Sequence, residues 1–288
     1  MVDVASTAGT LFIVGTPIGN LEDITLRALR VLREVSVIAA EDTRRTAQLL
    51  ARHAIHTPLT SLHEHNEERK TPALLQRVQR GESIALVSDA GTPTVSDPGS
   101  GLVRAAIDAN LRVESIPGPS AVIAALVVSG LSTRPFTFMG FAPTRSKDRT
   151  KWFAEARAVG GTVVFFEAPH RIRSTLEELK AVVGDCRVAV ARELTKIHEE
   201  LVRGPISDVL ERMKVIRGEF TVVAEIGHIT DPVLPEPASD RELLLQFGVM
   251  TKTGAVRRRE AIAALARRHA RPSSDIYQAI ERAKKSGE

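Results

Sequence analysis

The stretch that most restricts the fold of this chain is a loop of small side chains at residues 88–99 (SDAGTPTVSDPG), which follows the apolar run SIALV at 83–87. Such a run is typical of a strand buried on both faces, as in parallel sheets. The loop holds two glycines, two prolines and the carboxylates of Asp89 and Asp97. Glycine lets the backbone approach a ligand closely, and proline fixes the shape of the loop. Because open α/β sheets bind ligands past the carboxyl ends of their strands, we expect a ligand site here.

Two further loops have the same composition and the same position after a strand. GTPIGN at residues 15–20 follows the apolar run 11–14, and PGPSA at residues 117–121 follows the run 112–116. Loops that follow parallel strands lie at one edge of the sheet. We therefore expect the three loops to line one small-molecule site.

The first half of the chain alternates strands with helices. Strands are predicted at 11–14, 35–40, 58–62, 83–87 and 112–116, and helices at 24–34, 46–53, 66–80, 100–109 and 120–129. Asp23 is the expected N-cap of the first helix. This alternation predicts a parallel sheet covered by helices on both faces.

A second α/β unit is predicted to follow. Its strands are expected at 136–141, 162–166, 187–192 and 220–226, and its helices at 147–159, 171–183 and 207–215. A proline-rich linker and three short helices complete the chain, the first helix opening with a capping box at residues 239–242. The predicted fold class is α/β, with two α/β domains (1–133 and 134–230) that form a cleft, a linker (231–239) and a small C-terminal helical module (240–288).

Charge is distributed unevenly along the chain. The last 48 residues hold 11 Lys or Arg and 5 Asp or Glu, whereas the first 240 hold 28 and 30. A near-neutral body with a basic tail fits a body that carries out chemistry and a tail that binds nucleic acid. A solvated, arginine-rich helix face would give the same numbers. The RNA-binding candidates in this tail are Arg257, Arg258 and Arg259.

What the sequence lacks disfavours several classes of protein. No apolar run approaches the roughly 20 residues of a membrane span, and the first residues have no basic segment of a signal peptide, so we expect a cytoplasmic protein. A single cysteine, Cys186, allows no internal disulfide and no cysteine-based zinc site, and we expect no metal. The motifs GxxxxGK[ST], GxGxxG and GxSxG are absent, which disfavours nucleoside triphosphate, nicotinamide and flavin sites and a hydrolase nucleophile.

Six motifs carry a resemblance to a known family. VGTPIGNLEDIT at residues 14–25 resembles the opening signature of the tetrapyrrole methylase-like superfamily, in its ribosomal RNA branch. The later signatures of that branch are similar to EDTR (41–44), SDAGTPTVSDPG (88–99), PGPSA (117–121), EAPHR (167–171) and RELTK (192–196), in the same order. The resemblance covers roughly residues 11–228. It implies S-adenosylmethionine as methyl donor and, as in the 16S rRNA cytidine 2'-O-methyltransferases of that branch, a cytidine of the decoding region as acceptor.

The resemblance also assigns site residues. It places the donor in the cleft between the two domains, held by Pro17, Asp89, Thr94, Val95, Ser96, Ser120, Ala121, Phe166, Leu194 and Thr221. It places Asn20 and Arg44 on the side of the acceptor RNA. These assignments are physically reasonable, because small residues let the backbone approach a ligand and a carboxylate accepts hydrogen bonds from an amino group.

Methyl transfer to a ribose hydroxyl requires alignment of the reactants, exclusion of water and a group that accepts the hydroxyl proton. The candidates at predicted strand ends are Glu41, Asp42, Glu167, His170, Glu193 and Lys196, and their spacing does not choose among them. Asp42 and Arg44 are the preferred acceptor-side pair, and Glu167 and Lys196 complete the catalytic candidates. Each of these residues has a structural alternative as a helix cap or a surface ion pair.

Two other functions fit part of the pattern. A methylase of a tetrapyrrole or another small molecule would use the same cleft but would not need a basic tail. A non-catalytic RNA-binding assembly factor would keep the fold without binding the donor. The resemblance further implies a homodimer and, as partner, the 16S rRNA within the small ribosomal subunit.

Overall fold

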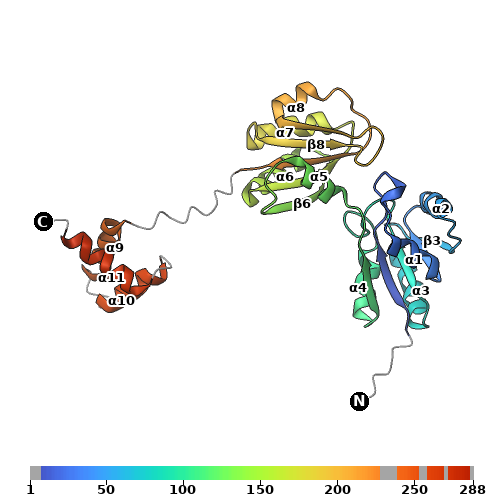
Figure 1. The fold of residues 1–288 in the computed structure, drawn as a ribbon, viewed down its shortest axis with the longest axis horizontal. Coiled ribbons are helices and arrows are strands. Elements are labelled where there is room, and N and C mark those ends of the chain that lie inside the picture. Colours follow the sequence, from blue (N-terminus) through green and yellow to red (C-terminus); the bar gives the residue numbers. More distant parts are fainter. Residues whose placement is uncertain (1–7, 228–238, 253–257, 269–271, 286–288) are drawn as a thin grey trace, which may run out of the picture. The chain divides into compact units, whose positions relative to one another are not determined.

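A computed structural model describes residues 8–227, 239–252, 258–268 and 272–285. The chain forms two compact units, Met1–Gly227 and His228–Glu288 (Figure 1). The first unit contains two five-stranded sheets. Of the predicted linker, only Ser239 lies inside the described residues. No helix in the described ranges combines the length and the apolar character that crossing a bilayer requires.

The first sheet is parallel throughout, as the alternating pattern predicts. Its strands are β1 (Thr10–Val14), β2 (Val37–Ala40), β3 (Leu59–Ser61), β4 (Ile84–Val87) and β5 (Arg112–Ile116). The order across the sheet is β3-β2-β4-β1-β5, and every neighbouring pair is parallel. The uninterrupted apolar run thus forms β4, which lies in the middle of the sheet and is buried along its whole length. The carboxyl ends of β1, β2 and β4 therefore lie side by side.

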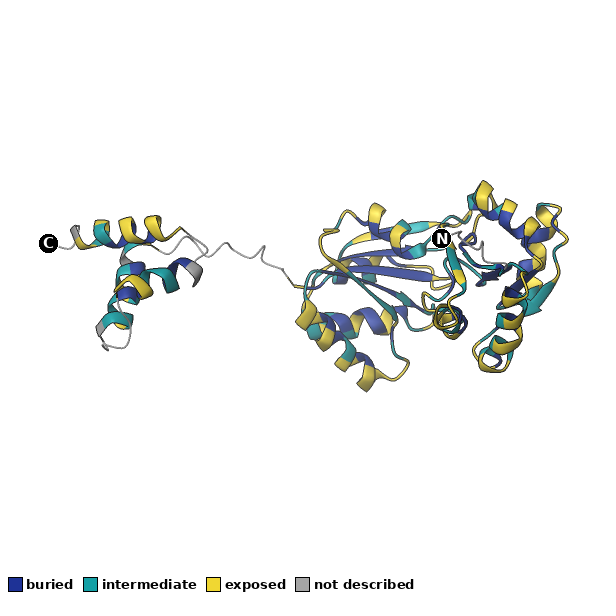
Figure 2. Ribbon diagram, turned by 90° about the horizontal axis from the view of Figure 1, so that it is seen from below, coloured by how far each residue is buried: buried dark blue, intermediate teal, exposed yellow. Residues whose placement is uncertain are grey.

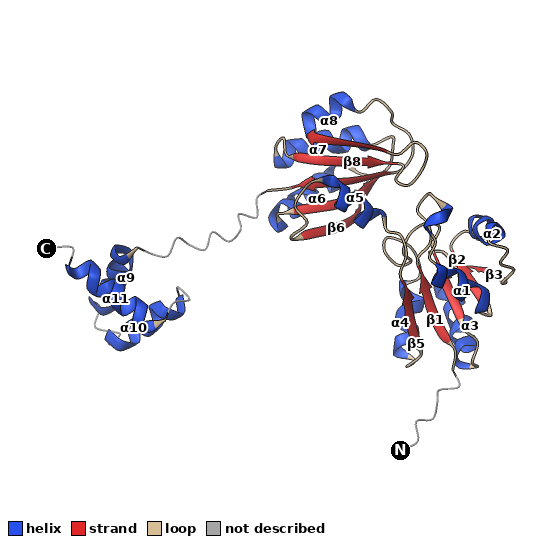
Figure 3. Cartoon of the chain, viewed as in Figure 1, coloured by secondary structure: helices blue, strands red, loops and turns tan. Residues whose placement is uncertain are grey.

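Helices cover both faces of this sheet (Figure 3). One face packs against α1 (Leu26–Glu34) and α2 (Thr43–Arg52), and the other against α3 (Glu67–Gln79) and α4 (Ser100–Asp108). Alternate residues of β2 divide between the two cores, which is why all four of its side chains are apolar.

Two helix starts differ from the prediction. The N-cap of α1 is Thr25, whose hydroxyl accepts a hydrogen bond from the Ala28 N–H, whereas Asp23 ends the short 3-10 helix η1 (Leu21–Asp23). The carboxylate of Asp42 accepts a hydrogen bond from the Arg44 N–H and caps α2. Helix α2 therefore begins three residues before the predicted start, directly after the end of β2.

The second sheet is mixed. Its strands are β6 (Phe136–Phe141), β7 (Thr162–Glu167), β8 (Arg187–Arg192), β9 (Glu200–Pro205) and β10 (Phe220–Glu225), in the order β6-β7-β10-β8-β9. Only the β6–β7 pair is parallel. Strand β9 was not predicted, because as an edge strand it needs few apolar residues and ends in Arg203, Gly204 and Pro205.

The two faces of the second sheet are covered by different parts of the chain. Helices α6 (Ser146–Val159), α7 (Ile172–Val183) and α8 (Ile206–Arg212) pack on one face. The other face packs against α5 (Ala121–Ser129), although α5 follows the last strand of the first sheet. Figure 2 shows the buried strands of both sheets between their helices. Ile18, from the loop after β1, joins the apolar cluster under α5.

The second unit contains α9 (Asp240–Lys252), α10 (Arg258–Arg268) and α11 (Ser273–Lys285) among its described residues. They share a core that includes Leu243, Leu265 and Ile276. The predicted capping box is confirmed, because the Ser239 N–H lies 2.9 Å from Oε2 of Glu242 and the Glu242 N–H lies 3.3 Å from Oγ of Ser239. The predicted start of the middle helix, residues 253–257, lies outside the described residues.

Candidate active site

The three loops that follow β1, β4 and β5 are in direct backbone contact. The Thr16 N–H donates to the Gly91 carbonyl at 2.8 Å, and the Gly91 N–H donates to the Thr16 carbonyl at 3.1 Å. A Cβ atom on Gly15 would lie 2.8 Å from Cα of Gly118, so no side chain fits at this approach. The prediction that the three loops meet is confirmed.

Two segments of the second sheet touch these loops. The Asn20 N–H donates to Oγ1 of Thr195 at 3.0 Å, and a Cβ atom on Gly19 would lie 2.6 Å from Cγ of Lys196. The loop between β8 and β9, residues 193–199, is therefore in contact with the loop after β1. Strand β6 approaches the loop of residues 88–99 after β4, called the long loop from here on. A Cβ atom on Gly140 would lie 3.4 Å from Oγ of Ser96 in this loop.

Several residues assigned to the donor gather near the start of α5. Ala121, Phe166 and Leu194 belong to one apolar cluster. Thr221 is buried and lies opposite Phe166 in the β10–β7 register. Ser120 occupies the N-cap position of α5 but makes no capping hydrogen bond through its side chain. The hydroxyl of Ser120 is thus not committed to the helix it precedes.

The remaining donor candidates differ in exposure. Thr94 is half-buried, whereas Val95 and Ser96 are exposed at the outer side of the long loop. Pro17 is buried. A cavity of about 690 Å³ lies beside this loop, lined by Thr92, Pro93 and Thr94 together with side chains of α4 and β5.

A carboxylate cluster lies at the ends of β2 and β4, made of Glu41, Asp89 and Asp97 and here called the β4-side cluster. Oδ1 of Asp89 accepts a hydrogen bond from the Asp42 N–H at 2.9 Å, and Oε2 of Glu41 accepts one from the Asp89 N–H at 3.3 Å. Nη1 of Arg45 lies 3.3 Å from Oδ2 of Asp89. The guanidinium of Arg45 thus pairs with Asp89 and also acts on Glu41 through its charge, whereas it has no such effect on Asp97.

This cluster is under-compensated in charge. Burial, the negative charge of Glu41 and that of Asp89 raise the pKa of Asp97 from 3.8 to about 6. Burial also raises the pKa of Glu41, with further contributions from Asp89 and Asp42. A carboxyl group that titrates close to neutral pH is suited to accept a proton during a reaction. Asp97 is a site residue that the motifs do not single out, and its only signal in the sequence is that it is a second aspartate in the loop of residues 88–99.

Asp42 has the opposite character. Its carboxylate accepts hydrogen bonds from Nη2 of Arg44 at 2.9 Å and from the Arg44 N–H at 2.8 Å. These bonds lower the pKa of Asp42 to about 2. Such a carboxylate stays ionised and is a weak base, while the guanidinium of Arg44 is held at the surface with its side chain 88% exposed. The predicted Asp42–Arg44 pair exists. Its exposed guanidinium is suited to bind an anionic group of the substrate, whereas its ionised carboxylate is poorly suited to proton transfer.

Glu167 lies in a fully enclosed position. Its carboxylate accepts hydrogen bonds from Oγ1 of Thr175 at 2.5 Å and from the Ala168 N–H at 2.6 Å, and it pairs with Arg171 at 2.6 Å. With its side chain 0% exposed, Glu167 fixes the turn from β7 into α7. His170 is exposed in the same turn.

Lys196 belongs to a second charged cluster, Glu193, Lys196 and Glu219, here called the β8-side cluster. Nζ of Lys196 lies 2.9 Å from Oε1 of Glu193 and 3.0 Å from Oε2 of Glu219. Burial alone would lower the pKa of Lys196, but the hydrogen bonds to the two carboxylates raise it. The hydrogen bond from Lys196 lowers the pKa of Glu193. Glu193 and Lys196 are therefore held in their charged forms.

Both loops that carry these clusters contain strained backbone. Thr94 (φ +71°) and Ser96 (φ +66°) lie in the long loop, and Glu193 (φ +52°) and Thr195 (φ +66°) lie in the loop after β8. Left-handed backbone is costly for residues other than glycine, above all for β-branched threonine. Ala54 and Asn110 share the property but directly follow helices, where it is common. Strain of this kind gathers at functional sites.

The basic residues of the tail are only partly described. Arg257 lies outside the described residues. Nη2 of Arg258 lies 2.6 Å from Oε1 of Glu281, and its guanidinium lies 5.9 Å from the centre of the Tyr277 ring. Arg259 is exposed. The contacts of Arg258 are thus made within the module itself.

Comparison with known proteins gives matches over most of the chain. Residues 10–210 match the family of Tetrapyrrole (Corrin/Porphyrin) Methylases. A protein named ribosomal RNA small subunit methyltransferase I from Halalkalibacterium halodurans is 41% identical over 279 residues, which cover 93% of each chain. The protein of the same name from Bacillus subtilis is 45% identical over 222 residues, or 76% of each chain.

A solved structure supports the fold. The cobalt precorrin-4 methyltransferase CbiF, a cobalamin biosynthetic enzyme, superposes with a TM-score of 0.57 over 75% of this chain and 94% of its own. The two sequences are 18% identical, so this likeness concerns the architecture alone. The matched share corresponds to the size of the unit that contains the two sheets.

Proposed function

The chain belongs to the tetrapyrrole (corrin/porphyrin) methylase family, and from that premise we propose that it transfers a methyl group from S-adenosylmethionine to RNA of the small ribosomal subunit. The observation that carries this proposal is the 41% identity to a ribosomal RNA small subunit methyltransferase I over 93% of both chains. An alignment of that extent reaches into the basic C-terminal module, which a methylase of small molecules would not need.

We further propose the acceptor and the assembly. The acceptor is the ribose 2'-OH of a cytidine in the decoding region of 16S rRNA, the enzyme works in the cytoplasm, and it acts as a homodimer. The six ordered motifs of residues 14–196 support this more specific reading. The basic module, including Arg259, is proposed to contact the same RNA.

The residues present fit the donor. The apolar cluster of Ala121, Phe166 and Leu194 suits an adenine ring, and the free hydroxyl of Ser120 lies at its edge. The carboxylate of Asp89 suits an amino group, with which it would form a charge-assisted hydrogen bond. The close approach of Gly15 to Gly118 keeps side chains away from the floor of the site. S-adenosylmethionine supplies an electrophilic methyl group on a sulfonium.

The remaining tasks fall to residues of the chain. Asp97, with its pKa near 6, is proposed to accept the proton of the ribose hydroxyl, and Glu41 stands beside it as the alternative. Arg44, held by Asp42, is proposed to bind a phosphate next to the target nucleotide. The strained long loop holds Thr94 and Ser96 in place before the reactants arrive, which reduces the reorganisation that the reaction requires.

The test uses tritiated S-adenosylmethionine and small ribosomal subunits from a strain that lacks this protein, followed by nucleoside analysis of the RNA. Label in 2'-O-methylcytidine is the expected result. Label in another nucleoside would overturn the proposed acceptor. No label from a protein that still binds the donor would point to a small-molecule methylase, and a protein that does not bind the donor would be a non-catalytic factor.

A further inference from the structure

We propose that Ile197, at the tip of the loop after β8, is an aliphatic wedge that enters the base stack of the RNA when the target nucleotide is drawn into the site. The inference rests on the proposed function, because it names a contact with that RNA substrate. It assigns a positioning role to a residue outside the family-like motifs.

Ile197 is unusual in its exposure. Its relative exposure is 98%, the highest among the large hydrophobic residues of the described chain. Leu194, three residues earlier in the same loop, is buried in the cluster under α5. The loop therefore uses one aliphatic residue to anchor itself and holds the other in solvent, where it contributes no packing to the fold.

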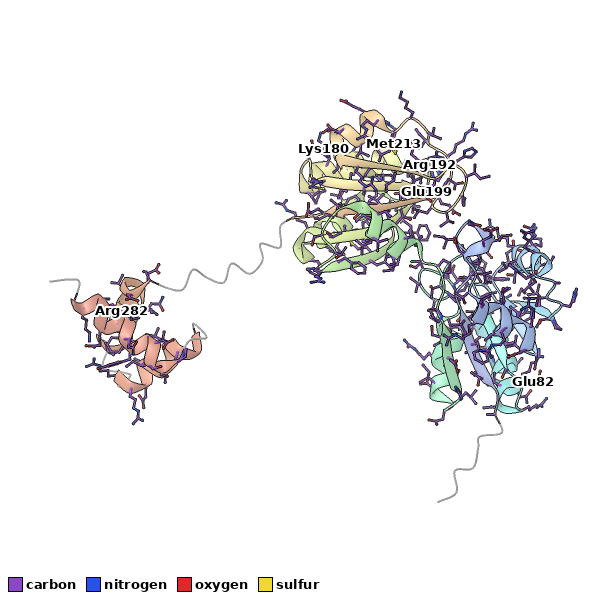
Figure 4. All side chains as sticks on the ribbon, viewed as in Figure 1. Glu82, Lys180, Arg192, Glu199, Met213 and Arg282 are labelled. Carbon is purple, nitrogen blue, oxygen red and sulfur yellow. The ribbon has the colours of Figure 1, made fainter. Side chains whose placement is uncertain are left out.

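The loop holds Ile197 out because its backbone is fixed on both sides. Thr195 has a φ of +66°, and its N–H donates to Oε2 of Glu199 at 2.6 Å. Lys196 bonds to Glu193 and Glu219, which joins this loop to the segment before β10. Figure 4 labels Arg192 and Glu199, which lie at the end of the second sheet on either side of the loop. A loop with a flexible backbone would bury its isoleucine, whereas the fixed backbone of this loop keeps Ile197 exposed to solvent.

The surroundings of Ile197 match a nucleic acid better than a protein core. The carboxylates of Glu193 and Glu199 are turned towards groups of the loop itself. Within the described part of the chain, His198 in this loop and Lys214 and Arg217 in the segment before β10 are exposed and form no ion pair. Two exposed basic side chains, Lys214 and Arg217, thus lie in the segment bonded to this loop, and basic groups near an aliphatic side chain suit phosphates and bases.

The position of this loop indicates how a wedge at Ile197 would act. Thr195 accepts the hydrogen bond from the Asn20 N–H, so Ile197 stands two residues from the contact with the loop after β1. In the proposed reaction, the target nucleotide leaves the base stack to bring its 2'-OH to the donor methyl group. Enzymes that extrude a nucleotide pay for unstacking, and an apolar side chain inserted between base steps offsets part of that cost.

The first experiment compares Ile197→Ala, Ile197→Phe and the control Val159→Ala. Val159 is an aliphatic residue that is 60% exposed at the end of α6 and does not belong to the loop after β8. We expect Ile197→Ala to lower kcat/KM for small subunits about tenfold to a hundredfold, the range of a lost base contact. Ile197→Phe should keep most of the kcat/KM of the unaltered protein. Donor affinity and melting temperature should not change in any of the three variants. A normal rate for Ile197→Ala would overturn the wedge.

A second experiment identifies the contact. A photo-crosslinking amino acid at position 197 should join the protein to 16S rRNA in the subunit. Crosslinks confined to a ribosomal protein, or to a second copy of this chain, would overturn the inference. Absence of methyl incorporation by the unaltered protein would instead overturn the proposed function, so the two failures are distinguishable.

Discussion

The β4-side and β8-side clusters are built from similar residues and have opposite electrostatics. In the β8-side cluster, the ammonium of Lys196 lies within 3.0 Å of a carboxylate oxygen of Glu193 and of Glu219, and the pKa of Glu193 falls. In the β4-side cluster, Arg45 forms an ion pair with Asp89 alone, and the pKa values of Glu41 and Asp97 rise. Asp89 and Asp97 lie in the loop after β4 and Glu193 and Lys196 in the loop after β8, and both loops contain left-handed residues other than glycine.

The difference indicates which cluster stabilises the fold and which one takes part in the reaction. A compensated cluster gains stability and has no tendency to exchange protons at neutral pH. An under-compensated cluster carries a desolvation cost that persists in the folded state, and a protein keeps such a cost where a reaction uses it. Lys196, a catalytic candidate from the sequence, lies in the first kind of cluster, and Asp97 lies in the second.

The strongest test of this contrast is Asp97→Asn, which we expect to lower turnover on small subunits about a hundredfold or more, the usual contribution of a general base. Donor affinity, measured by calorimetry, should change far less. Unaltered turnover would remove Asp97 from the reaction.

The same variant has a pH signature. The folded pKa of about 6 exceeds the ordinary 3.8, so the folded state binds more protons between these values and its stability falls as pH rises through that window. Asp97→Asn should abolish this slope and raise the melting temperature at pH 7.5. Asp185→Asn is the matched control with the opposite sign. Hydrogen bonds from Ser207 lower the pKa of Asp185, so its contribution is present above the ordinary pKa and is lost as pH falls. Equal effects of both variants on the melting temperature would contradict the contrast.

The next largest effect is expected for Asp89→Ala. A charge-assisted hydrogen bond contributes about 1.5–3 kcal/mol, which corresponds to a donor affinity about tenfold to a hundredfold weaker. Titration calorimetry with S-adenosylmethionine measures it, with Asp185→Ala as a carboxylate control far from the loops. If both variants bind the donor as the unaltered protein does, Asp89 serves only to hold the β2 and β4 ends together.

Removal of residues 240–288 tests whether both clusters work without the module. Because the module forms its own compact unit, donor affinity should be unchanged. Affinity for small subunits should fall about tenfold, with a smaller salt dependence, because fewer phosphate contacts are made. Filter binding across a salt series measures both quantities, and equal slopes with and without the module would show that it does not bind RNA.

The smallest effect is expected for Lys196→Met. Because the ion pairs of Lys196 are partly exposed, solvent screening limits their contribution to about 1 kcal/mol or less. We expect a melting temperature lower by a few degrees and turnover within about tenfold of the unaltered protein. A loss of turnover comparable to that of Asp97→Asn would restore Lys196 to the catalytic group and erase the contrast between the clusters.

Local sequence patterns predicted the elements whose environment repeats along the chain. The apolar run before the long loop is typical of a buried strand and forms one, and β5, β6 and β8 have the predicted ends. Strand β9 escaped because an edge strand needs no pattern of its own. The N-cap of α1 was misplaced because Asp23 and Thr25 are both good caps and only tertiary structure selects between them.

The location of the site was predictable from the sequence, whereas the roles of its residues were less predictable. The meeting of the three loops follows from the predicted parallel sheet, because the carboxyl ends of parallel strands lie at one edge. The contrast between Asp42 and Asp97 does not follow, because a pKa depends on burial and on neighbours distant in sequence. Glu41 and Asp97 are 56 positions apart in the chain, yet the negative charge of Glu41 raises the pKa of Asp97.

The placement of α5 bears on how this protein can be divided. A cut at the predicted boundary after residue 133 would leave α5 with the first sheet and its packing surface, around Val164, Ala189 and Val223, with the second. Each fragment would then expose an apolar face that invites aggregation. Gene fusions, split-protein reporters and recombination between relatives should therefore fail at that boundary and succeed near residue 227, where the compact unit ends.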